Sequence, residues 1–527
     1  MPHPARTAAR TALPLALAVL ACVACTPDDA PSPSGTVTAS ATSADADVAP
    51  VTADVVVRGE EVTLDVGPVA VTDDVGVLRI AGPKAASLQT ELWDVLVSVT
   101  PGANGVRLVD LTEGTVALPA RTEGDKVVAS WVRSVGGPAT DAAAEAAGDD
   151  TEVLYVAFAA PDDTTVDVLL PGGGGLVQEV PVVDAQDAGV LTVPASEIEE
   201  DPVATAPVVA LDTYTEQVGG QVRTRSTAQT VTVAIGSDVL FDVDSAELGP
   251  QSDAALAAAA QQVGAYDGGT LAVVGHTDDV ADEAYNQGLA ERRAQAVADR
   301  LGSLADLGGF ELSVQGRGEG EPAVSGTSPE ARAANRRVEL VLTTEQDEVA
   351  PTTQAPAGTL PETTGPTAAG EAAVTIDSGN GVPVDVRVRE VRRVGRFLVG
   401  SLEVTNTAGP DEAAGTLFST GAWDARGSFD ASLQQAATNV TLLRGDLRLY
   451  PVDYLVAEDR RDPLSDRVIY GPEKGSSILV TVVWPDPGAD AVVVDSPVQA
   501  KEVTESVSVD LRVQPFRITD VPVAGAP

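Results

Sequence analysis

Two long segments of this chain have too little apolar surface to belong to a folded core. Residues 26–50 and 346–370 are rich in Ser, Thr, Ala, Pro and acidic residues. Such segments cannot offset the conformational entropy lost on folding, so each is predicted to be a disordered tether or linker. Residues 200–227 are a looser acidic and polar stretch, predicted to be a further linker. The remaining sequence of this 527-residue chain forms three foldable blocks, at 51–199, 228–345 and 371–527.

The N-terminus has the pattern of a secretory signal. Within residues 1–25, two arginines precede an apolar run at 11–24 that is too short and too poorly flanked for a good membrane-spanning helix. The two cysteines of the chain, Cys22 and Cys25, lie at the end of this run. A cysteine after small residues in this place resembles the lipobox of bacterial lipoproteins, a family cleaved before the cysteine and lipidated on it. The resemblance implies a lipid anchor on Cys22 or Cys25; an ordinary signal peptide with incidental cysteines is the alternative.

Charge and composition limit the possible ligands. The formal net charge is −45, and so acidic a chain repels phosphates, so nucleic acid is not an expected partner. Any anionic ligand would need a local basic site. Two Cys and two His cannot supply a Cys/His zinc cluster, haem ligation or a disulfide framework. We therefore expect neither a metal nor a cofactor, although a calcium or carbohydrate role for acidic residues of blocks 51–199 and 371–527 stays open.

Blocks 51–199 and 371–527 are predicted to be mainly-β immunoglobulin-like sandwiches. Short β-branched runs recur in both between Gly, Pro and Asp turns. The third block resembles the telokin-like sandwiches of secreted Gram-positive lipoproteins, in pattern only. The two blocks also resemble each other, which predicts two copies of one fold; the matching segments are 105–109 with 446–450, and LYVAFAAPDDTTVDVLLPG with ILVTVVWPDPGADAVVVDSP. The four tryptophans are expected to be core residues: Trp93, Trp131, Trp423 and Trp484.

The middle block, 228–345, alternates strand and helix patterns, which predicts an α/β sandwich. The expected helix at 284–304 has Arg293 and Asn286 within its core-facing stripe. A buried arginine is costly unless a carboxylate or a ligand neutralises it. Asp278 lies between a predicted strand and this helix.

Asp278 and Arg293 together would form a pocket for a zwitterion such as an amino-acid terminus. The carboxylate can take an ammonium group, and the guanidinium can hold a carboxylate bidentately. Arg300 lies on the same stripe and weakens this argument, because one helix should not need two such arginines. A purely structural ion pair between Asp278 and Arg293 is the alternative.

Four motifs of this block resemble the OmpA-like peptidoglycan-binding domain, which is also found in peptidoglycan-associated lipoproteins and flagellar motor stators. They occur in order and at suitable spacing: VLFDVDSAEL at 239–248, GHTD at 275–278, YNxxLxxxRAxAV at 285–297 and RxxNRRVE at 332–339. The resemblance covers roughly a fifth of the chain and implies an α/β fold that binds the cell wall.

The resemblance also implies roles for individual residues. Asp278 and Arg293 would hold the diaminopimelate of the peptide stem by its ammonium and carboxylate, assisted by Asn286 and the loop of Asp244 and Ser245. Supporting residues would be Phe241, Thr277, Leu289, Arg332, Asn335 and Arg336. No residue is predicted to be catalytic, and His276 is expected to be structural. Ala281 and Ala290 replace a usual Gly and a usual Ser, so loop geometry and one hydroxyl contact are expected to differ.

The predicted function is non-enzymatic: a cell-envelope lipoprotein whose lipid holds the membrane and whose middle block binds peptidoglycan. The flanking blocks would be spacers or docking surfaces for other envelope proteins. One alternative is a wall-acting hydrolase, and another is a ligand-binding protein, each with its active part in a sandwich. The flanking blocks contain no His, no Cys and no GxSxG motif, which argues against Ser/His or Cys/His catalysis. A paired-carboxylate glycosidase site remains open.

Overall fold

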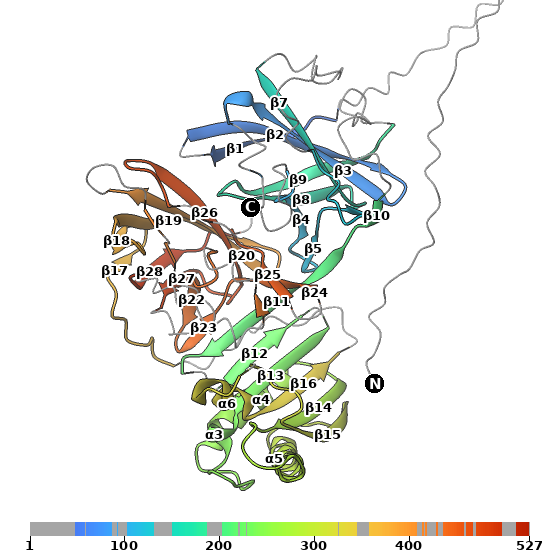
Figure 1. The fold of residues 1–527 in the computed structure, drawn as a ribbon, viewed down its shortest axis with the longest axis vertical. Helices are drawn as coiled ribbons and strands as arrows, with labels where there is room; N and C mark the ends of the chain where they lie inside the picture. The colour runs from blue at the N-terminus through green and yellow to red at the C-terminus, as the bar shows by residue number, and fades with distance from the viewer. Residues whose placement is uncertain are drawn as a thin grey trace, which may run out of the picture.

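The computed structural model consists of two mainly-β blocks and one α/β block (Figure 1). Both cysteines, residues 26–47 of the predicted tether at 26–50, and three of the four tryptophans (Trp93, Trp131 and Trp423) lie outside the described residues. No helix in the described part of the chain is long and apolar enough to cross a membrane. The described residues are 48–57, 60–86, 92, 103–130, 150–186, 203–219, 222–227, 229–324, 326–344, 358–407, 414–415, 417–418, 428–429, 436–457, 460–466, 469, 471–497 and 513–525.

The first block packs two sheets around one apolar core. One antiparallel sheet contains β1 (Val51–Val57), β2 (Glu60–Thr72), β3 (Val75–Pro83) and β7 (Thr151–Ala159). The other contains β4 (Arg107–Asp110), β5 (Thr115–Ala117), β8 (Thr165–Leu170) and β9 (Gly175–Asp184). Leu78 and Phe158 from the first sheet share a core with Val168 from the second. Shorter elements are η1 (Lys84–Ala86), β6 (Arg121–Thr122) and β10 (Val203–Thr205).

The third block has the same two-layer arrangement. One sheet contains β18 (Val374–Asp377), β19 (Pro383–Val394), β20 (Phe397–Asn406) and β26 (Ser477–Pro485). The other contains β17 (Thr367–Ala369), β22 (Thr441–Arg444), β23 (Leu447–Leu449), β27 (Ala491–Ser496) and β28 (Phe516–Pro522). Trp484 is fully buried between them and donates its indole N–H to Val440 O at 2.6 Å, which confirms its predicted core position. The remaining strands are β21 (Ser428–Phe429), β24 (Asp453–Ala457) and β25 (Arg460–Pro463).

The strand pairing of these two blocks supports the predicted internal repeat. The order β1–β2–β3–β7 matches β18–β19–β20–β26, and β5–β4–β8–β9 matches β23–β22–β27–β28. The similar segments 154–172 and 478–497 therefore fall on equivalent strands. The proposed match of 105–109 with 446–450 is wrong by one strand, because it places β4 on β23 rather than on β22. The immunoglobulin-like assignment of both blocks stays a prediction.

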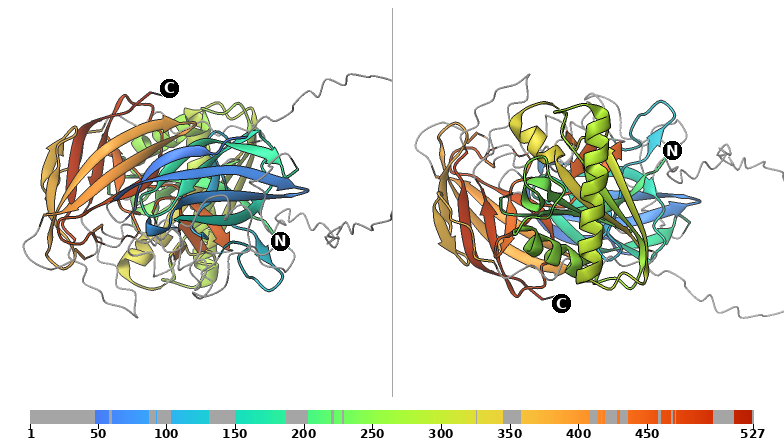
Figure 2. Two further views of the ribbon diagram at one scale, coloured as in Figure 1. Left: turned by 90° about the horizontal axis from the view of Figure 1, so that it is seen from above. Right: turned by 90° about the horizontal axis from the view of Figure 1, so that it is seen from below.

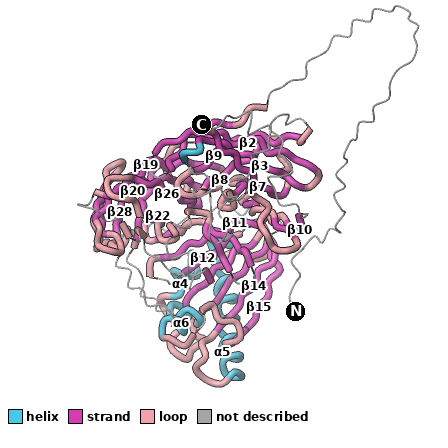
Figure 3. Tube along the Cα trace, turned by 45° about the horizontal axis from the view of Figure 1, so that its top comes forward, coloured by secondary structure: helices cyan, strands magenta, loops and turns pink. Residues whose placement is uncertain are grey.

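The middle block is an α/β unit, and the α-helices of the described chain gather there (Figure 3). Its strands β13 (Thr230–Gly236), β14 (Gly269–His276), β15 (Phe310–Gly318) and β16 (Arg337–Thr343) lie in the order β13–β16–β14–β15, and only β14 and β15 are parallel. Its helices are α3 (Ser237–Leu240), α4 (Ser252–Val263), α5 (Glu283–Leu304) and α6 (Pro329–Asn335). Leu256 of α4 and Val297 of α5 pack on Leu271 of β14 in one core.

Residues 200–227, predicted to be a linker, instead contain strands that join all three blocks. β11 (Val208–Gln217) pairs with β5 of the first block through Val208–Ala210, and with β23 of the third block through Thr215–Gln217. β12 (Val222–Ser226) pairs with β11 on one side and with β13 on the other. The end of the predicted linker 346–370 is also ordered, since β17 pairs with β28. Backbone pairing outweighs the polar composition of these segments, and β11 crosses between the three groups in Figure 1.

Four buried or half-buried charged side chains, one of them on β11, form a network of ion pairs at this strand. Asp453 Oδ1 accepts hydrogen bonds from Arg225 Nη1 at 3.1 Å and Arg461 Nη1 at 2.8 Å, and its side chain is fully buried. Asp212 of β11 accepts from the same two arginines. Burial raises the pKa of Asp212, against the opposing charge of Arg461. The charges balance as two acids and two bases drawn from β11, β12, β24 and β25, so removing any member leaves the charges of this group unbalanced.

We predict that Asp453→Ala lowers the free energy of unfolding of the β blocks by about 3 kcal/mol, because it leaves Arg225 and Arg461 undercompensated in a buried site. All four tryptophans lie outside the middle block, so urea denaturation followed by tryptophan fluorescence reports on the β blocks. Arg387→Ala, which removes the half-exposed partner of Glu403, is the control and should cost less than about 1 kcal/mol. Equal losses of unfolding free energy in both variants would show that the charges at β11 contribute no more to stability than an exposed ion pair does.

Candidate functional site

The candidate site lies where the central strand of the middle block meets the start of its longest helix. β14 ends at His276, and Asp278 follows in the loop that leads to α5. Asp282 caps α5 by accepting a hydrogen bond from Tyr285 N at 2.9 Å, which fixes where the helix begins. Asn286 and Arg293, two turns apart, both lie on the buried face of α5, as its periodicity predicts. Figure 2 shows this helix lying along the sheet.

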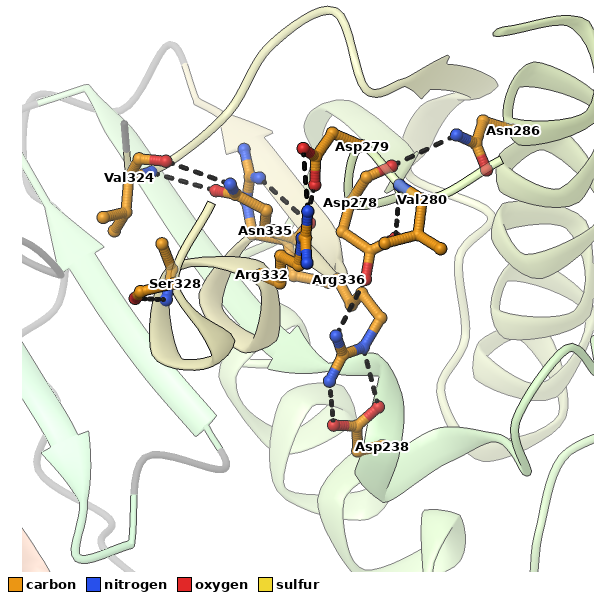
Figure 4. Close-up of polar contacts among 12 residues, drawn as sticks. Asp238, Asp278, Asp279, Val280, Asn286, Val324, Ser328, Arg332, Asn335 and Arg336 are labelled. Atoms are coloured by element: carbon orange, nitrogen blue, oxygen red, sulfur yellow. Dashed lines mark hydrogen bonds and ion pairs between the residues drawn. The ribbon is translucent and has the colours of Figure 1, made fainter. Parts of the chain in front are cut away.

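The carboxylate of Asp278 is held by Arg336. Its Oδ2 accepts a hydrogen bond from Arg336 Nη1 at 2.8 Å, and its Oδ1 accepts one from Val280 N at 3.2 Å (Figure 4). Arg336 also forms a two-pronged ion pair with Asp238, through Nε at 3.1 Å and Nη2 at 2.7 Å. The hydrogen bonds to Asp238 and then Asp278 raise the pKa of Arg336. Asp278 is therefore fixed in position before any ligand arrives.

Arg293 is buried beside this group, with only 4% of its surface exposed. Its Nε donates to the backbone carbonyl of Ser245 at 2.9 Å, and its guanidinium lies 5.1 Å from the centre of the Phe241 ring. Burial lowers the pKa of Arg293, and the charges of Asp238, Asp244 and Asp278 oppose that effect. Within the described residues its two terminal amino groups have no hydrogen-bond partner, and no ion pair joins it to Asp278. The structure thus lacks the closed Asp278–Arg293 ion pair that was the structural alternative.

Asn286 links the Asp278 loop to the end of β15. Its side chain is buried, and its Nδ2 donates to Asp278 O at 3.2 Å and to Glu319 Oε2 at 2.6 Å. Glu319 directly follows β15, the parallel neighbour of β14. Asn286 therefore lies within the predicted site and fixes the backbone of Asp278.

The loop of Asp244 and Ser245 also lies at the site. Asp244 has a positive φ of 61° and accepts a hydrogen bond from the Tyr285 hydroxyl. Ser245 Oγ accepts from Glu247 N at 2.9 Å and so closes a turn. The backbone carbonyl of Ser245, and not its hydroxyl, orients Arg293.

The remaining predicted residues support this geometry. Arg332 on α6 forms a two-pronged ion pair with Asp279, at 2.6 and 3.2 Å. Asn335 exchanges two hydrogen bonds with the backbone of Val324, at 3.0 and 2.9 Å (Figure 4). Thr277 and Leu289 are buried, and Thr277 N donates to Gly318 O at 2.9 Å.

Arg300 lies on the same stripe of α5 as Arg293, but it forms an ion pair with Asp253. Its Nη2 lies 2.9 Å from Asp253 on α4, and both side chains are substantially exposed. Arg293 and Arg300 lie on the same stripe of α5, but Arg293 is buried and Arg300 is partly exposed. Only the charge of Arg293 therefore needs a compensating group at the site. The two arginines can therefore be used as a matched pair in experiments.

His276 is buried behind the site, next to a carboxylate. Its Nε2 lies 3.5 Å from Glu339 Oε2, while Arg337 Nε donates to Glu339 Oε1 at 2.6 Å. Burial raises the pKa of Glu339, but His276 and Arg337 outweigh it and lower the pKa to about 2. The described residues contain no group of three or more His, Cys, Asp or Glu side chains that could hold a metal ion.

The two substitutions within the motifs have different structural consequences. Ala281 has a φ of +123°, a conformation that glycine adopts without strain and alanine does not. Ala290 is fully buried, and its backbone lies so close to Gly275 that a Cβ there would meet Ala290 O at 2.2 Å. Position 281 is therefore strained, whereas position 290 is a helix–strand packing position.

Three further residues contribute to the site that the sequence did not reveal: Asp238, Tyr285 and Glu319. Asp238 is 98 residues from Arg336, and Glu319 is 33 residues from Asn286, so no local spacing connects them. Tyr285 is 40% exposed, and its hydroxyl donates to Asp244. Its tip is polar, and this amphipathic character is the one signal that could have indicated a rim position.

The fold is a small α/β domain, and its candidate site combines a fixed acid with an arginine whose terminal amino groups have no partner within the described residues. Residues 240–336 match the OmpA family, and this part of the chain is an OmpA family domain, as the motifs predicted. Outer membrane protein A of Bordetella avium is 38% identical over 110 residues, which cover 21% of this chain and 56% of that protein. Outer membrane porin F of Pseudomonas aeruginosa is 38% identical over 113 residues, covering 21% and 32%.

Solved structures give matches to the same part of the chain. The cell wall anchor of the T6SS from Pseudomonas aeruginosa is 33% identical, with coverage of 24% of this chain and 90% of that one and a TM-score of 0.22. The peptidoglycan-associated lipoprotein from Burkholderia pseudomallei is 27% identical, with coverage of 21% and 88% and a TM-score of 0.17. The chain spans 56% or less of the length of the two outer-membrane relatives, so the match concerns one domain.

We predict that Ala281→Gly stabilises the middle block by about 1 kcal/mol, because relief of the strained φ exceeds the extra chain entropy of glycine. Thermal unfolding followed by the helical circular-dichroism signal reports on this block. Ala284→Gly, at an exposed position in the first turn of α5, is the control and should destabilise it by up to about 1 kcal/mol. A loss of stability in Ala281→Gly would contradict the strain at this position.

We also predict an acid-sensitive contribution from Glu339. Because its pKa is lowered below the unfolded value of 4.5 to about 2, its stabilisation is present above pH 4.5 and is lost as the pH falls toward 2. Glu339→Gln should cost about 3 kcal/mol at neutral pH and show less acid dependence in that window. Urea denaturation followed by the helical signal, with exposed Glu311→Gln as control, measures this. Parallel pH profiles for wild type and Glu339→Gln would refute it.

Proposed function

We propose that this protein binds peptidoglycan non-covalently in the cell envelope, through the diamino acid of the peptide stem. Membership of the middle domain in the OmpA family and its similarity to a peptidoglycan-associated lipoprotein support this proposal. The observation that carries it is Arg293. This arginine is buried, is oriented by the Ser245 carbonyl and the Phe241 ring, and keeps its terminal amino groups for a ligand.

The chemistry of recognition follows from the two charged ends of the site. A diaminopimelate side chain carries an ammonium and a carboxylate on one carbon. The ammonium would bind the carboxylate of Asp278, and the carboxylate would take the two terminal amino groups of Arg293. Arg336 and Asn286 already hold Asp278 in place, so little ordering is needed on binding.

The rest of the chain suits a protein that connects membrane and wall. A lipid on Cys22 or Cys25 would hold the N-terminus at the membrane, with 26–50 as the tether. The pairing of β11 and β12 supports a wall-binding domain that is attached to both β blocks through a continuous sheet. Those blocks would then act as spacers or as docking surfaces for other envelope proteins, and no enzymatic step is part of the proposal.

We predict that Asp278→Ala and Arg293→Lys each weaken binding of the full chain to purified peptidoglycan that contains diaminopimelate by about tenfold or more. Each variant removes a charge-assisted contact, and lysine keeps the charge at 293 but loses the fork. Sedimentation with insoluble wall, quantified over a range of protein concentrations, measures the affinity.

Arg300→Lys is the matched control, because Arg300 is on the same helix but pairs with Asp253 outside the site. Its binding should equal that of wild type. Undiminished binding by both Asp278→Ala and Arg293→Lys would reject recognition through this pocket, and absence of binding by wild type would reject the function itself.

A further inference from the structure

Three carboxylates at the site have an arginine partner, but Glu319 has none within the described residues. Asp278 and Asp238 share Arg336, and Asp279 pairs with Arg332. Within the described residues no ion pair involves Glu319, which is half-buried directly after β15. Its Oε2 accepts a 2.6 Å hydrogen bond from Asn286 Nδ2, and this contact holds it against the Asp278 loop. Within the described residues, a carboxylate without an ion-pair partner is thus held through Asn286 at the backbone of the Asp278 loop.

The charge of Asp278 itself is partly cancelled. The guanidinium of Arg336 lies between two carboxylates, so Asp238, Arg336 and Asp278 together carry one net negative charge. An ammonium group placed at Asp278 would therefore interact with a shared charge rather than with a full one. Glu319 would supply a second negative charge at this end of the pocket.

Asp244 also has no ion pair within the described residues, but it contacts Tyr285 rather than Asn286. It accepts the Tyr285 hydroxyl, and its charge raises the pKa of Arg293 against the effect of burial. Glu319 instead contacts Asn286, which donates to the backbone of Asp278. Asp244 is the neighbour of Ser245, whose carbonyl orients Arg293, whereas Glu319 is held at the Asp278 loop.

We propose that Glu319 is a specificity residue that recognises the ammonium group of the ligand together with Asp278, an inference that rests on the proposed function. Asn286 positions both acids by donating to Glu319 and to the backbone of Asp278. The pocket then selects for a free amine on the diamino acid, because a neutral group there would leave the charge of Glu319 without a partner.

The test compares two synthetic stem tripeptides that end in meso-diaminopimelate, one with a free side-chain amine and one acetylated on it. Affinities are measured for the full chain by calorimetry. Glu319→Gln should weaken binding of the free-amine peptide about fivefold, since a neutral contact replaces a charge-assisted one. The ratio of affinities for free and acetylated peptide should fall by a similar factor. Glutamine can still accept the Asn286 hydrogen bond, so a purely structural role of Glu319 would leave both quantities unchanged.

Glu321→Gln is the matched control, because Glu321 is two residues away and pairs with Arg317 at 3.5 Å. It removes the same charge and should bind both peptides as wild type does. Wild-type affinity in Glu319→Gln together with weak binding in Glu319→Ala would overturn the proposal, since Glu319 would then only position Asn286. Failure of wild type to bind the free-amine peptide would overturn the proposed function as well. Binding by wild type with no effect of Glu319→Gln would overturn only the role of Glu319.

Discussion

The arrangement of the described chain depends on the backbone pairing of a single strand, β11. A strand presents N–H and C=O groups on both edges, and those groups are costly if they are buried without partners. β11 pairs its N-terminal part with β5 and its C-terminal part with β23, and β12 continues the pairing into the middle domain. In the two-layer blocks β5 and β23 are equivalent strands, so β11 extends both copies of the repeat at the same edge. Four buried or half-buried charges stabilise this junction: Asp212, Asp453, Arg225 and Arg461. Each acid forms ion pairs with both arginines, which requires one relative placement of the strands that carry them.

The candidate site follows a related principle on a smaller scale, in which buried charges are either compensated or kept for a ligand. Arg336 is fully engaged by two carboxylates, and Arg332 by one. Arg293 differs, because its partners within the described chain are a carbonyl and an aromatic ring. This difference separates Arg293 from Arg332 and Arg336, whose guanidinium groups are held by carboxylates. It also explains why the strongly negative net charge of the chain is compatible with binding a carboxylate at one position.

The sequence predicts the structure of the middle domain better than that of its surroundings, because the sequence patterns of the middle domain are longer. The 3.6-residue periodicity of α5 and the four motifs located the helix, the strand end and the buried Arg293. The partner of Asp278 could not be predicted, because Arg336, Asp238 and Glu319 reach the site from distant parts of the chain. β11 and β12 were predicted to be a linker because their composition is polar, and composition carries no information about pairing with strands more than 200 residues away. The repeat of the β blocks was visible, but similar valine-rich strands allowed a match shifted by one strand.

The central claim is that a ligand with adjacent ammonium and carboxylate groups completes the charges of this pocket. The most direct measurement is a crystal structure of the full chain with a stem peptide that contains diaminopimelate. The account predicts the ligand carboxylate on the two terminal amino groups of Arg293, with the ammonium in hydrogen-bond contact with Asp278. A ligand bound in the reverse orientation, or one bound away from α5 with Arg293 untouched, would contradict it.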